Sequence, residues 1–248
     1  MLDKKTPEEI KILREGGKIL GQILRQLASD VKVGNTGKAL NAKAEELIKQ
    51  AGGTPAFKNY HGFPAALCVS INEAVVHGIP TAEPLQEGDL VGIDLGIKYK
   101  GFYTDTAMTV GVGKISPESE QLLKITKQSL YIAIDQLKIG GYISDIGKVI
   151  EKFIKPYGYG IVRDLAGHGV GRKVHEEPSV PNYYQGRKSV QIFDGMVIAI
   201  EPMLIMGGDW RVKTRDNKWD VISNDGSATA HFEHSVAITK DGNIILTE

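Results

Sequence analysis

Four segments of the chain place apolar residues at helical spacing between polar ones. The first begins at Thr6-Pro7-Glu8-Glu9, which is typical of a helix N-terminus, and continues with Ile10, Leu13, Leu20, Ile23, Leu24 and Leu27. The second covers about residues 38–50 and ends at Gly52-Gly53. The third opens at Ser116-Pro117 and reaches about residue 137, and the fourth covers about 144–155 and ends near Gly158. The pattern predicts two long and two shorter helices.

The helical pattern and the segments around it occur twice. VKVG at 31–34 matches LKIG at 137–140 at an offset of 106 residues, and GDLVGID at 88–94 matches GMVIAIE at 195–201 at an offset of 107. Each half is therefore two helices followed by strands, the α+β type of an α/β fold. Because nothing resembles a linker, we expect one domain, 1–248, with pseudo-two-fold halves at about 1–113 and 114–248 and sheets joined over a shared centre.

The strand expected at 91–98 alternates between an apolar face and a face that carries Asp94 between two glycines. The chain then turns back and reaches Asp105. A two-residue turn at Tyr99-Lys100 would set Asp105 directly opposite Asp94, whereas a turn one residue later would keep both on one face but displace them diagonally. Two like charges this close destabilise a sheet, so we expect either a bound cation or a solvated hairpin face.

Two further carboxylates stand in segments that should form apolar strands. Glu201 lies within MVIAIEPML and Glu233 within AHFEHSVAI, and neither segment contains an arginine or a lysine. A buried carboxylate requires a partner or a proton. With Asp94, Asp105 and His168 they make a set of four carboxylates and one imidazole, to which both halves contribute. Two divalent ions would neutralise the four charges, and this oxygen-rich set suits Mn, Co or Fe(II) at least as well as Zn.

His168 belongs to GHGVGRKVHEEP at 167–178, a segment that also contains His175. Their spacing equals two helical turns, but each glycine in the segment would cost a helix about 1 kcal/mol relative to alanine. We therefore predict a loop that brings imidazoles to a site. Taken alone, the two histidines are also consistent with ordinary polar surface residues.

Composition narrows the class of protein. The 248 residues are 42% hydrophobic and 24% charged, as in ordinary globular proteins, and include 30 basic and 30 acidic residues. This balance gives no global attraction to nucleic acid or anionic lipid. No apolar run is long enough to span a bilayer, the N-terminus lacks a signal-peptide core, and the single cysteine, Cys68, excludes an intrachain disulfide. We expect a cytoplasmic protein with no membrane partner and no direct readout of nucleic acid.

The ordered motifs resemble the type I methionine aminopeptidases, the short bacterial-type form of a family with the pita-bread fold, in which duplicated halves surround a curved antiparallel sheet. The similarity covers nearly the whole chain, through SINEAVVHGIP, GDLVGIDLGIKYKGFYTDTA, GHGVGRKVHEEP, IAIEPM and FEHSVAIT. Each motif is moderately specific, and the ordered set is highly specific. The resemblance implies removal of the initiator methionine from nascent chains when the second residue is small, with two divalent metal ions per chain as cofactors.

The resemblance also implies roles for single residues. The metal ligands would be Asp94, Asp105, His168, Glu201 and Glu233, with Asp105 and Glu233 bridging the two ions. Glu201 would move a proton toward the leaving amine, while His175 would hydrogen-bond the tetrahedral intermediate and His77 the scissile amide. A methionine pocket would be formed by soft and aromatic side chains, namely Phe57, Tyr60, Phe63, Cys68 and Trp219. Ordinary core packing would explain these five residues equally well.

Two positions depart from the family pattern. His231 stands where a glutamine is common and Val174 where an aromatic residue is common. Both departures concern the pocket contacts and its rim, and they leave the ligand set untouched.

Two alternative functions stay open. Enzymes of the same fold, such as prolidase and aminopeptidase P, cleave bonds to proline, but they usually carry an additional N-terminal domain for which we expect no room here. A non-catalytic module that binds peptides would typically have lost metal ligands, whereas all five are present. If the resemblance holds, we expect a monomer that acts on nascent N-termini and associates transiently with the ribosome, although no segment identifies a docking surface.

Overall fold

The helices lie where the sequence pattern predicts them. The computed structural model describes residues 2–248. Within that range the α-helices are α1 (Pro7–Ser29), α2 (Gly37–Gln50), α3 (Pro117–Asp135) and α4 (Ser144–Ile154), and short 3-10 helices cover Tyr60–Gly62 and Lys155–Tyr157. Thr6 and Glu9 form a reciprocal capping box at the start of α1. Each side chain accepts the backbone N–H of the other residue, which has no partner within the helix. All four predicted helices are confirmed.

The strands form one large sheet and two small ones. The large sheet has nine strands, seven of them in the order β1-β4-β5-β14-β9-β7-β8, while β2 pairs with β4 and β15 with β14. The small sheets have the orders β13-β10-β6 and β11-β12-β3. The bounds are β1 (Thr54–Pro55), β2 (Leu67–Ile71), β3 (Ala74–Val76), β4 (Leu90–Tyr99), β5 (Phe102–Gly111), β6 (Gly160–Ile161), β7 (Gly167–Gly169), β8 (Glu176–Val180), β9 (Met196–Ile200), β10 (Met203–Ile205), β11 (Val212–Thr214), β12 (Val221–Ser223), β13 (Thr229–His231), β14 (Glu233–Thr239) and β15 (Gly242–Ile245).

The two halves of the chain meet in the middle of the large sheet. Strand β5 of the first half pairs with β14 of the second, and β4 and β9, whose sequences match at the offset of 107, lie outside this central pair. All the strand pairs named here are antiparallel. The expectation of a mixed α/β fold with sheets joined over a shared centre is therefore confirmed.

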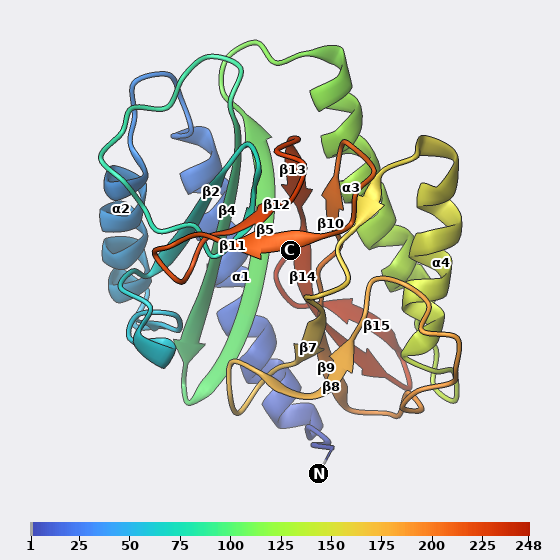
Figure 1. The fold of residues 1–248 in the computed structure, drawn as a ribbon. Helices are drawn as coiled ribbons and strands as arrows, with labels where there is room; N and C mark the ends of the chain where they lie inside the picture. The colour runs from blue at the N-terminus through green and yellow to red at the C-terminus, as the bar shows by residue number, and fades with distance from the viewer. Residues whose placement is uncertain (1) are drawn as a thin grey trace.

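The helices cover one face of this sheet (Figure 1). Helices α1 and α2 pack against the first half, where Leu20 and Leu40 share a buried cluster with Ile93. Helices α3 and α4 pack against the second half, where Ile146 lies in a cluster with Ile198. Because side chains alternate along a strand, the residues between these apolar ones face the other side of the sheet, away from the helices.

The β4–β5 hairpin settles the arrangement of the two aspartates. Tyr99 pairs with Phe102, so the turn residues are Lys100 and Gly101, which both have positive φ values of 47° and 90°. This conformation suits the right-handed twist of a two-residue hairpin. Asp105 therefore lies opposite Gly96, and the diagonal arrangement is confirmed. The alternative turn at Tyr99-Lys100, with the aspartates directly opposite, is wrong.

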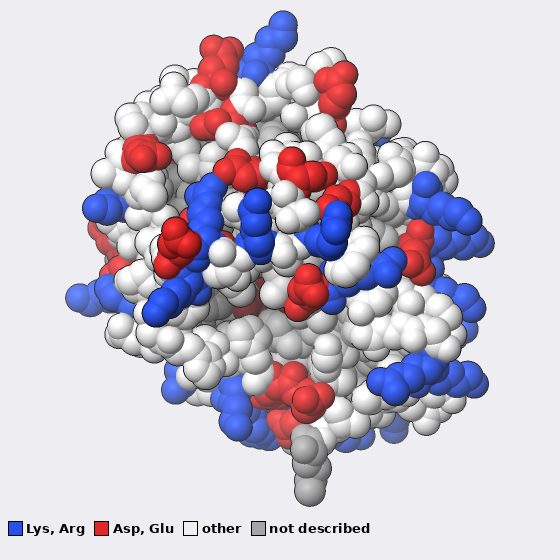
Figure 2. Space-filling model, in the orientation of Figure 1, with Lys and Arg blue, Asp and Glu red and all other residues white. Residues whose placement is uncertain are grey.

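The outer surface carries both signs of charge. Figure 2 shows lysine and arginine interspersed with aspartate and glutamate on one face, and a hollow near its centre with acidic atoms inside. No helix of residues 2–248 has both the length and the apolar character needed to cross a membrane.

Candidate metal centre and active site

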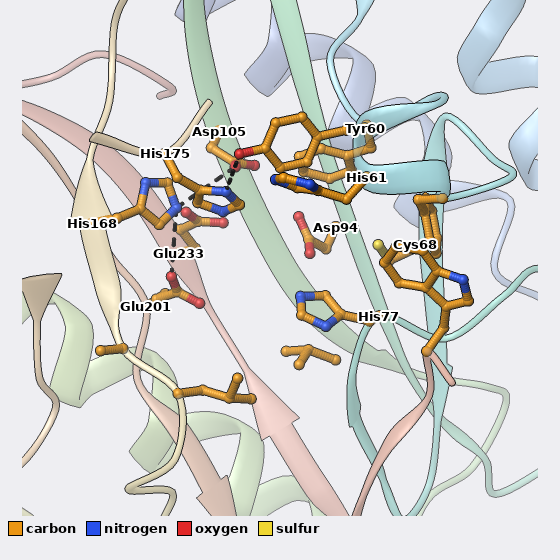
Figure 3. Close-up of a pocket in the computed structure, with 16 residues that line it drawn as sticks. Tyr60, His61, Cys68, His77, Asp94, Asp105, His168, His175, Glu201 and Glu233 are labelled. Carbon is orange, nitrogen blue, oxygen red and sulfur yellow. Dashed lines mark hydrogen bonds and ion pairs between the residues drawn. The ribbon is translucent and has the colours of Figure 1, made fainter. Parts of the chain in front are cut away.

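A cavity of about 260 Å³ opens on the side of the large sheet opposite the helices (Figure 3). All twelve predicted site residues line it, and they belong to three groups. The predicted metal ligands are Asp94, Asp105, His168, Glu201 and Glu233. The predicted pocket residues are Phe57, Tyr60, Phe63, Cys68 and Trp219, and the other two are His77 and His175. The structure thus brings together residues that are up to 176 positions apart in the sequence.

The five predicted ligands come from five neighbouring strands. In the order of the sheet, β4, β5, β14, β9 and β7 supply Asp94, Asp105, Glu233, Glu201 and His168, with Glu201 directly after β9. Ala107 of β5 pairs with Asp94 on one side and with Glu233 on the other. Its small side chain leaves room between the two carboxylates, so the register alone gathers the acidic groups over one point of the sheet.

The ligand atoms are close enough to share an ion. Single atoms of Asp105, His168 and Glu233 lie within 4.8 Å of one another. His168 Nε2 lies 3.7 Å from a carboxylate oxygen of Glu201 and 4.0 Å from one of Asp105. Asp94 lies beside this group in Figure 3, on the side toward Cys68. Divalent ions bound at about 2.0–2.2 Å from carboxylate and imidazole ligands fit such spacings.

Burial and mutual repulsion shift the pKa values of these carboxyl groups. Burial raises the pKa of Asp94 and of Glu233 well above the usual range, and the neighbouring Asp105 charge adds to the effect. Burial likewise raises the pKa of Asp105 to about 6, although His168 opposes it. For Glu201 burial also acts upward, but the close contact with His231 and the charges of nearby histidines outweigh it and lower the pKa.

The same carboxylates have unused acceptor atoms. Asp105 Oδ1 and Glu233 Oε1 are buried and receive no hydrogen bond from any residue of the described range 2–248. A buried acceptor without a donor is costly, and a cation compensates both the missing bond and the like-charge repulsion. The donor set, one nitrogen and several carboxylate oxygens, therefore fits divalent metal ions.

The segment 167–178 is partly a strand, which corrects the prediction of a loop. His168 lies on the three-residue strand β7, and only residues 170–175 are irregular. The glycines around it serve close packing: a Cβ atom on Gly169 would lie 2.3 Å from the carbonyl oxygen of Glu177 on β8. The strand fixes the direction of His168, whereas His175 reaches the cavity from the loop.

His175 is held beside the predicted ligands as a neutral imidazole. Its Nδ1 atom lies 3.0 Å from the Tyr60 hydroxyl, and its ring meets the His168 ring edge to face at a centroid distance of 4.2 Å. Burial, together with the charge of His168, lowers the pKa of His175 to about 4. Burial also lowers the pKa of His77. Both imidazoles are therefore neutral near pH 7 and each carries one N–H donor.

The five predicted pocket residues pack together at the other end of the cavity. Phe57, Phe63 and Cys68 are buried in one cluster, with Tyr60 and Trp219 packed against it. The Phe63 and Trp219 rings meet edge to face at a centroid distance of 5.1 Å. Burial, and then the charge of Asp94, raises the pKa of the Cys68 thiol well above its usual range. The thiol is therefore protonated and forms an apolar wall.

Sequence reasoning missed some residues of the cavity. His61 lines it beside Tyr60, with ring centroids 4.4 Å apart. His231, noted only as a departure, places Nε2 3.4 Å from a Glu201 oxygen, and Val174 is buried in the pocket cluster. His61 follows a tyrosine in a loop without regular periodicity, so only the polar residue type gave a signal. The spacing of His231 two positions before Glu233 was the available signal for its contact.

The chain is similar to known metallopeptidases over almost its whole length. The model of metallopeptidase family M24 matches residues 11–240. The methionine aminopeptidase of Clostridium perfringens is 44% identical over 247 residues, which cover 100% of this chain and 99% of the relative.

Solved structures extend the likeness to the fold. The crystal structure of methionine aminopeptidase from Thermotoga maritima matches with a TM-score of 0.97 at 39% identity and covers 100% of both chains. Prolidase from Pyrococcus furiosus matches with a TM-score of 0.80 at 27% identity, covering 99% of this chain but 65% of the prolidase. These likenesses confirm the pita-bread fold that the sequence motifs implied. The chain belongs to metallopeptidase family M24.

Proposed function

We propose that the protein is a methionine aminopeptidase, which removes the N-terminal methionine of a polypeptide when the second residue is small. The observation that carries this proposal is the meeting of two surfaces in one cavity. One is the carboxylate and histidine set from five neighbouring strands, and the other is the buried cluster of Cys68 with aromatic side chains. A flexible thioether suits such a soft apolar wall. The full-length methionine aminopeptidase relatives support the same activity.

The proposal includes two divalent ions. Four carboxylates carry four negative charges, which two divalent ions neutralise. Asp105 and Glu233, which have the unused buried oxygens, are the residues best suited to serve both ions. Asp94 would complete the ligands of one ion, and His168 and Glu201 those of the other. The oxygen-rich donor set suits Mn, Co, Fe(II) or Zn.

The chain's own groups then have distinct tasks in hydrolysis of the first peptide bond. When bound, the ions polarise the scissile carbonyl and lower the pKa of a water molecule. Glu201, whose pKa is lowered, is ionised near pH 7 and accepts the proton of the attacking water, which it then passes to the leaving amine. The pocket cluster holds the methionine side chain and excludes water from that end of the cavity.

The proposal assigns a tautomer to His175 through its contact with Tyr60. Burial raises the pKa of Tyr60, so its hydroxyl keeps its proton. In this proposal the hydroxyl donates that proton to Nδ1 of His175, which lies 3.0 Å away. The single N–H of the neutral ring is then on Nε2. From there it donates to the negative charge that develops on the carbonyl oxygen, while His77 hydrogen-bonds the scissile amide.

The partners of such an enzyme are the N-termini of newly made polypeptides. Transient association with the ribosome, a monomeric state and a cytoplasmic location belong to the same proposal.

The substrate preference can be tested directly. The purified protein supplied with Mn²⁺ should release methionine from Met-Gly peptides at least about tenfold faster than from Met-Lys peptides, since a small cavity excludes a bulky second residue. Equal release from both peptides would refute the specificity, and hydrolysis of X-Pro peptides alone would assign a prolidase-like activity.

The metal ligands can be ranked. Chelation should abolish activity, and Mn²⁺, Co²⁺ or Fe²⁺ should restore it. Asp105→Ala should lose more bound metal per chain than Asp94→Ala, because a bridging ligand serves both ions. Elemental analysis of the purified variants measures this difference. Full activity in a metal-free preparation would contradict the mechanism, and equal metal loss in the two variants would contradict the bridging assignment.

Substitutions of His168 and of His175 should have different effects on metal content and on kcat, although both residues lie in the segment 167–178. His168→Ala removes a ligand and should lower metal content and activity together, and excess Mn²⁺ should partly restore both. His175→Ala should keep its metal and lower kcat by about 100- to 1000-fold with a much smaller change in KM, because it removes one donor to the developing charge. Loss of metal from His175→Ala, or a near-normal kcat, would show that the role given to His175 is wrong.

A further inference from the structure

Lys5 is buried, unlike every other lysine and arginine among residues 2–248. Its side chain is only 1% exposed. An ammonium group loses its hydration in such a position, and only close partners compensate for that loss. Lys5 stands in the short segment 3–6 that precedes α1, and in Figure 1 this N-terminal end of the chain lies beside β7 and β8.

The acidic partners of Lys5 are Glu176, the first residue of β8 and the neighbour of His175, and Asp3 of its own N-terminal segment. Lys5 Nζ is 2.5 Å from Glu176 Oε2 and 2.9 Å from Asp3 Oδ2. The other oxygen of Glu176 accepts the backbone N–H groups of Arg172 and Lys173, at 2.5 and 2.8 Å. The Glu176 carboxylate thus binds two backbone amides of the loop and links the loop to the N-terminal segment through a buried ion pair.

The Arg172 side chain adds a second attachment between the same two segments. Its guanidinium donates to Asp3 at 2.9 Å and to Glu9 at 2.6 Å. This pair is half exposed, so it contributes little by itself. The buried Lys5–Glu176 pair is therefore the main electrostatic restraint on the loop.

Packing confirms that Lys5 and the loop fit each other. Gly171 has a φ of +146°, and a Cβ atom there would lie 2.5 Å from Lys5 Cε. The aliphatic part of Lys5 therefore occupies the space that a side chain at position 171 would need. On its other side Gly171 accepts the N–H of Tyr103 at 2.6 Å, which ties the loop to β5.

We propose that Lys5 is a positioning residue that acts through Glu176 to hold the 171–175 loop so that the His175 ring faces the cavity. His175 directly precedes Glu176 and follows the irregular stretch 171–174, so its backbone has no strand of its own to fix it. The catalytic part of this inference rests on the role proposed above for His175. The structural part, order in the loop, does not.

The test compares two adjacent lysines. Lys5→Met removes the buried charge and keeps an unbranched apolar chain. Lys4→Met is the matched control, because the Lys4 side chain is 62% exposed and its one ionic partner among residues 2–248 is Asp194, at 3.0 Å. In Lys5→Met the amides of Arg172 and Lys173 should exchange hydrogen at least about tenfold faster. The kcat on a Met-Gly peptide should fall by at least about tenfold, with metal content and KM little changed, because a small displacement of a catalytic group slows the chemical step. Lys4→Met should behave as wild type in all four measurements.

A second pair of variants covers the case in which Lys5→Met folds poorly. Glu176→Gln keeps the shape of the side chain. The double variant Lys5→Met/Glu176→Gln removes both charges of the pair, so no unpaired charge stays buried between these two positions. The double variant should fold, with the same faster exchange and lower kcat as Lys5→Met. The losses in kcat should not multiply, because both changes break one restraint.

The same substitutions made in a His175→Ala background distinguish an error in the role of Lys5 from an error in the role of His175. There, Lys5→Met should lower kcat no further. If Lys5→Met lowered kcat by the same factor in the His175→Ala background as in the wild type, the inference would be overturned. It would also be overturned if His175→Ala had a low kcat while Lys5→Met kept normal hydrogen exchange and a normal kcat. A His175→Ala variant with normal kcat would instead refute the proposed function, while the exchange result would still decide whether Lys5 orders the loop.

Discussion

Mutual repulsion among buried carboxylates shapes this protein more than any other single interaction. Asp94, Asp105, Glu201 and Glu233 are placed around one point by the register of four adjoining antiparallel strands. Such a group is unfavourable in the sheet unless protons or cations compensate it, and the upward pKa shifts of three members express that cost. The two helix pairs and their apolar clusters stabilise the sheet from the opposite face and so hold the acidic groups in place.

The same burial divides the cavity into parts with different chemistry. It keeps His175 and His77 neutral, so each carries one N–H donor and no positive charge that would compete with cations for the carboxylates. It keeps the Cys68 thiol protonated, so the pocket wall stays apolar. Glu201 is the exception, because His231 holds it ionised. These differences support the proposed arrangement, with cations at one end of the cavity, a thioether at the other and a peptide bond between them.

Much of this arrangement is visible in the sequence, because carboxylates in apolar strands are improbable without a partner. The helices follow from periodicity and from cap residues such as Thr6 and Ser116, both of which accept the expected backbone N–H. The hairpin register did not follow, since two turns keep Asp94 and Asp105 on one face and only the backbone angles at Lys100 and Gly101 choose between them. Nor did the strand at His168, whose glycines indicate flexibility locally but serve close packing against β8.

Lys5 shows a limit of local reasoning. Beside Lys4 in an acidic and basic segment it looks like any exposed lysine, and its burial depends on Glu176, a residue 171 positions later. Contacts of this range follow from topology, which brings the N-terminal segment of the first half beside Glu176 on the edge strand β8 of the second half.

The central claim is that the buried carboxylates are the binding site of divalent cations. It is tested most directly by the gain in unfolding free energy that Mn²⁺ gives to the metal-free protein, measured by urea denaturation between about pH 5 and pH 8. A carboxyl whose pKa is raised in the folded state stabilises the metal-free protein at low pH and loses that contribution as the pH rises through its folded pKa, which is about 6 for Asp105. Burial also raises the pKa values of Asp94 and Glu233 well above their usual range. Mn²⁺ must displace these protons, so its stabilising effect should grow as the pH rises across this window. A gain that is absent, or that is the same at both ends of the window, would contradict the account.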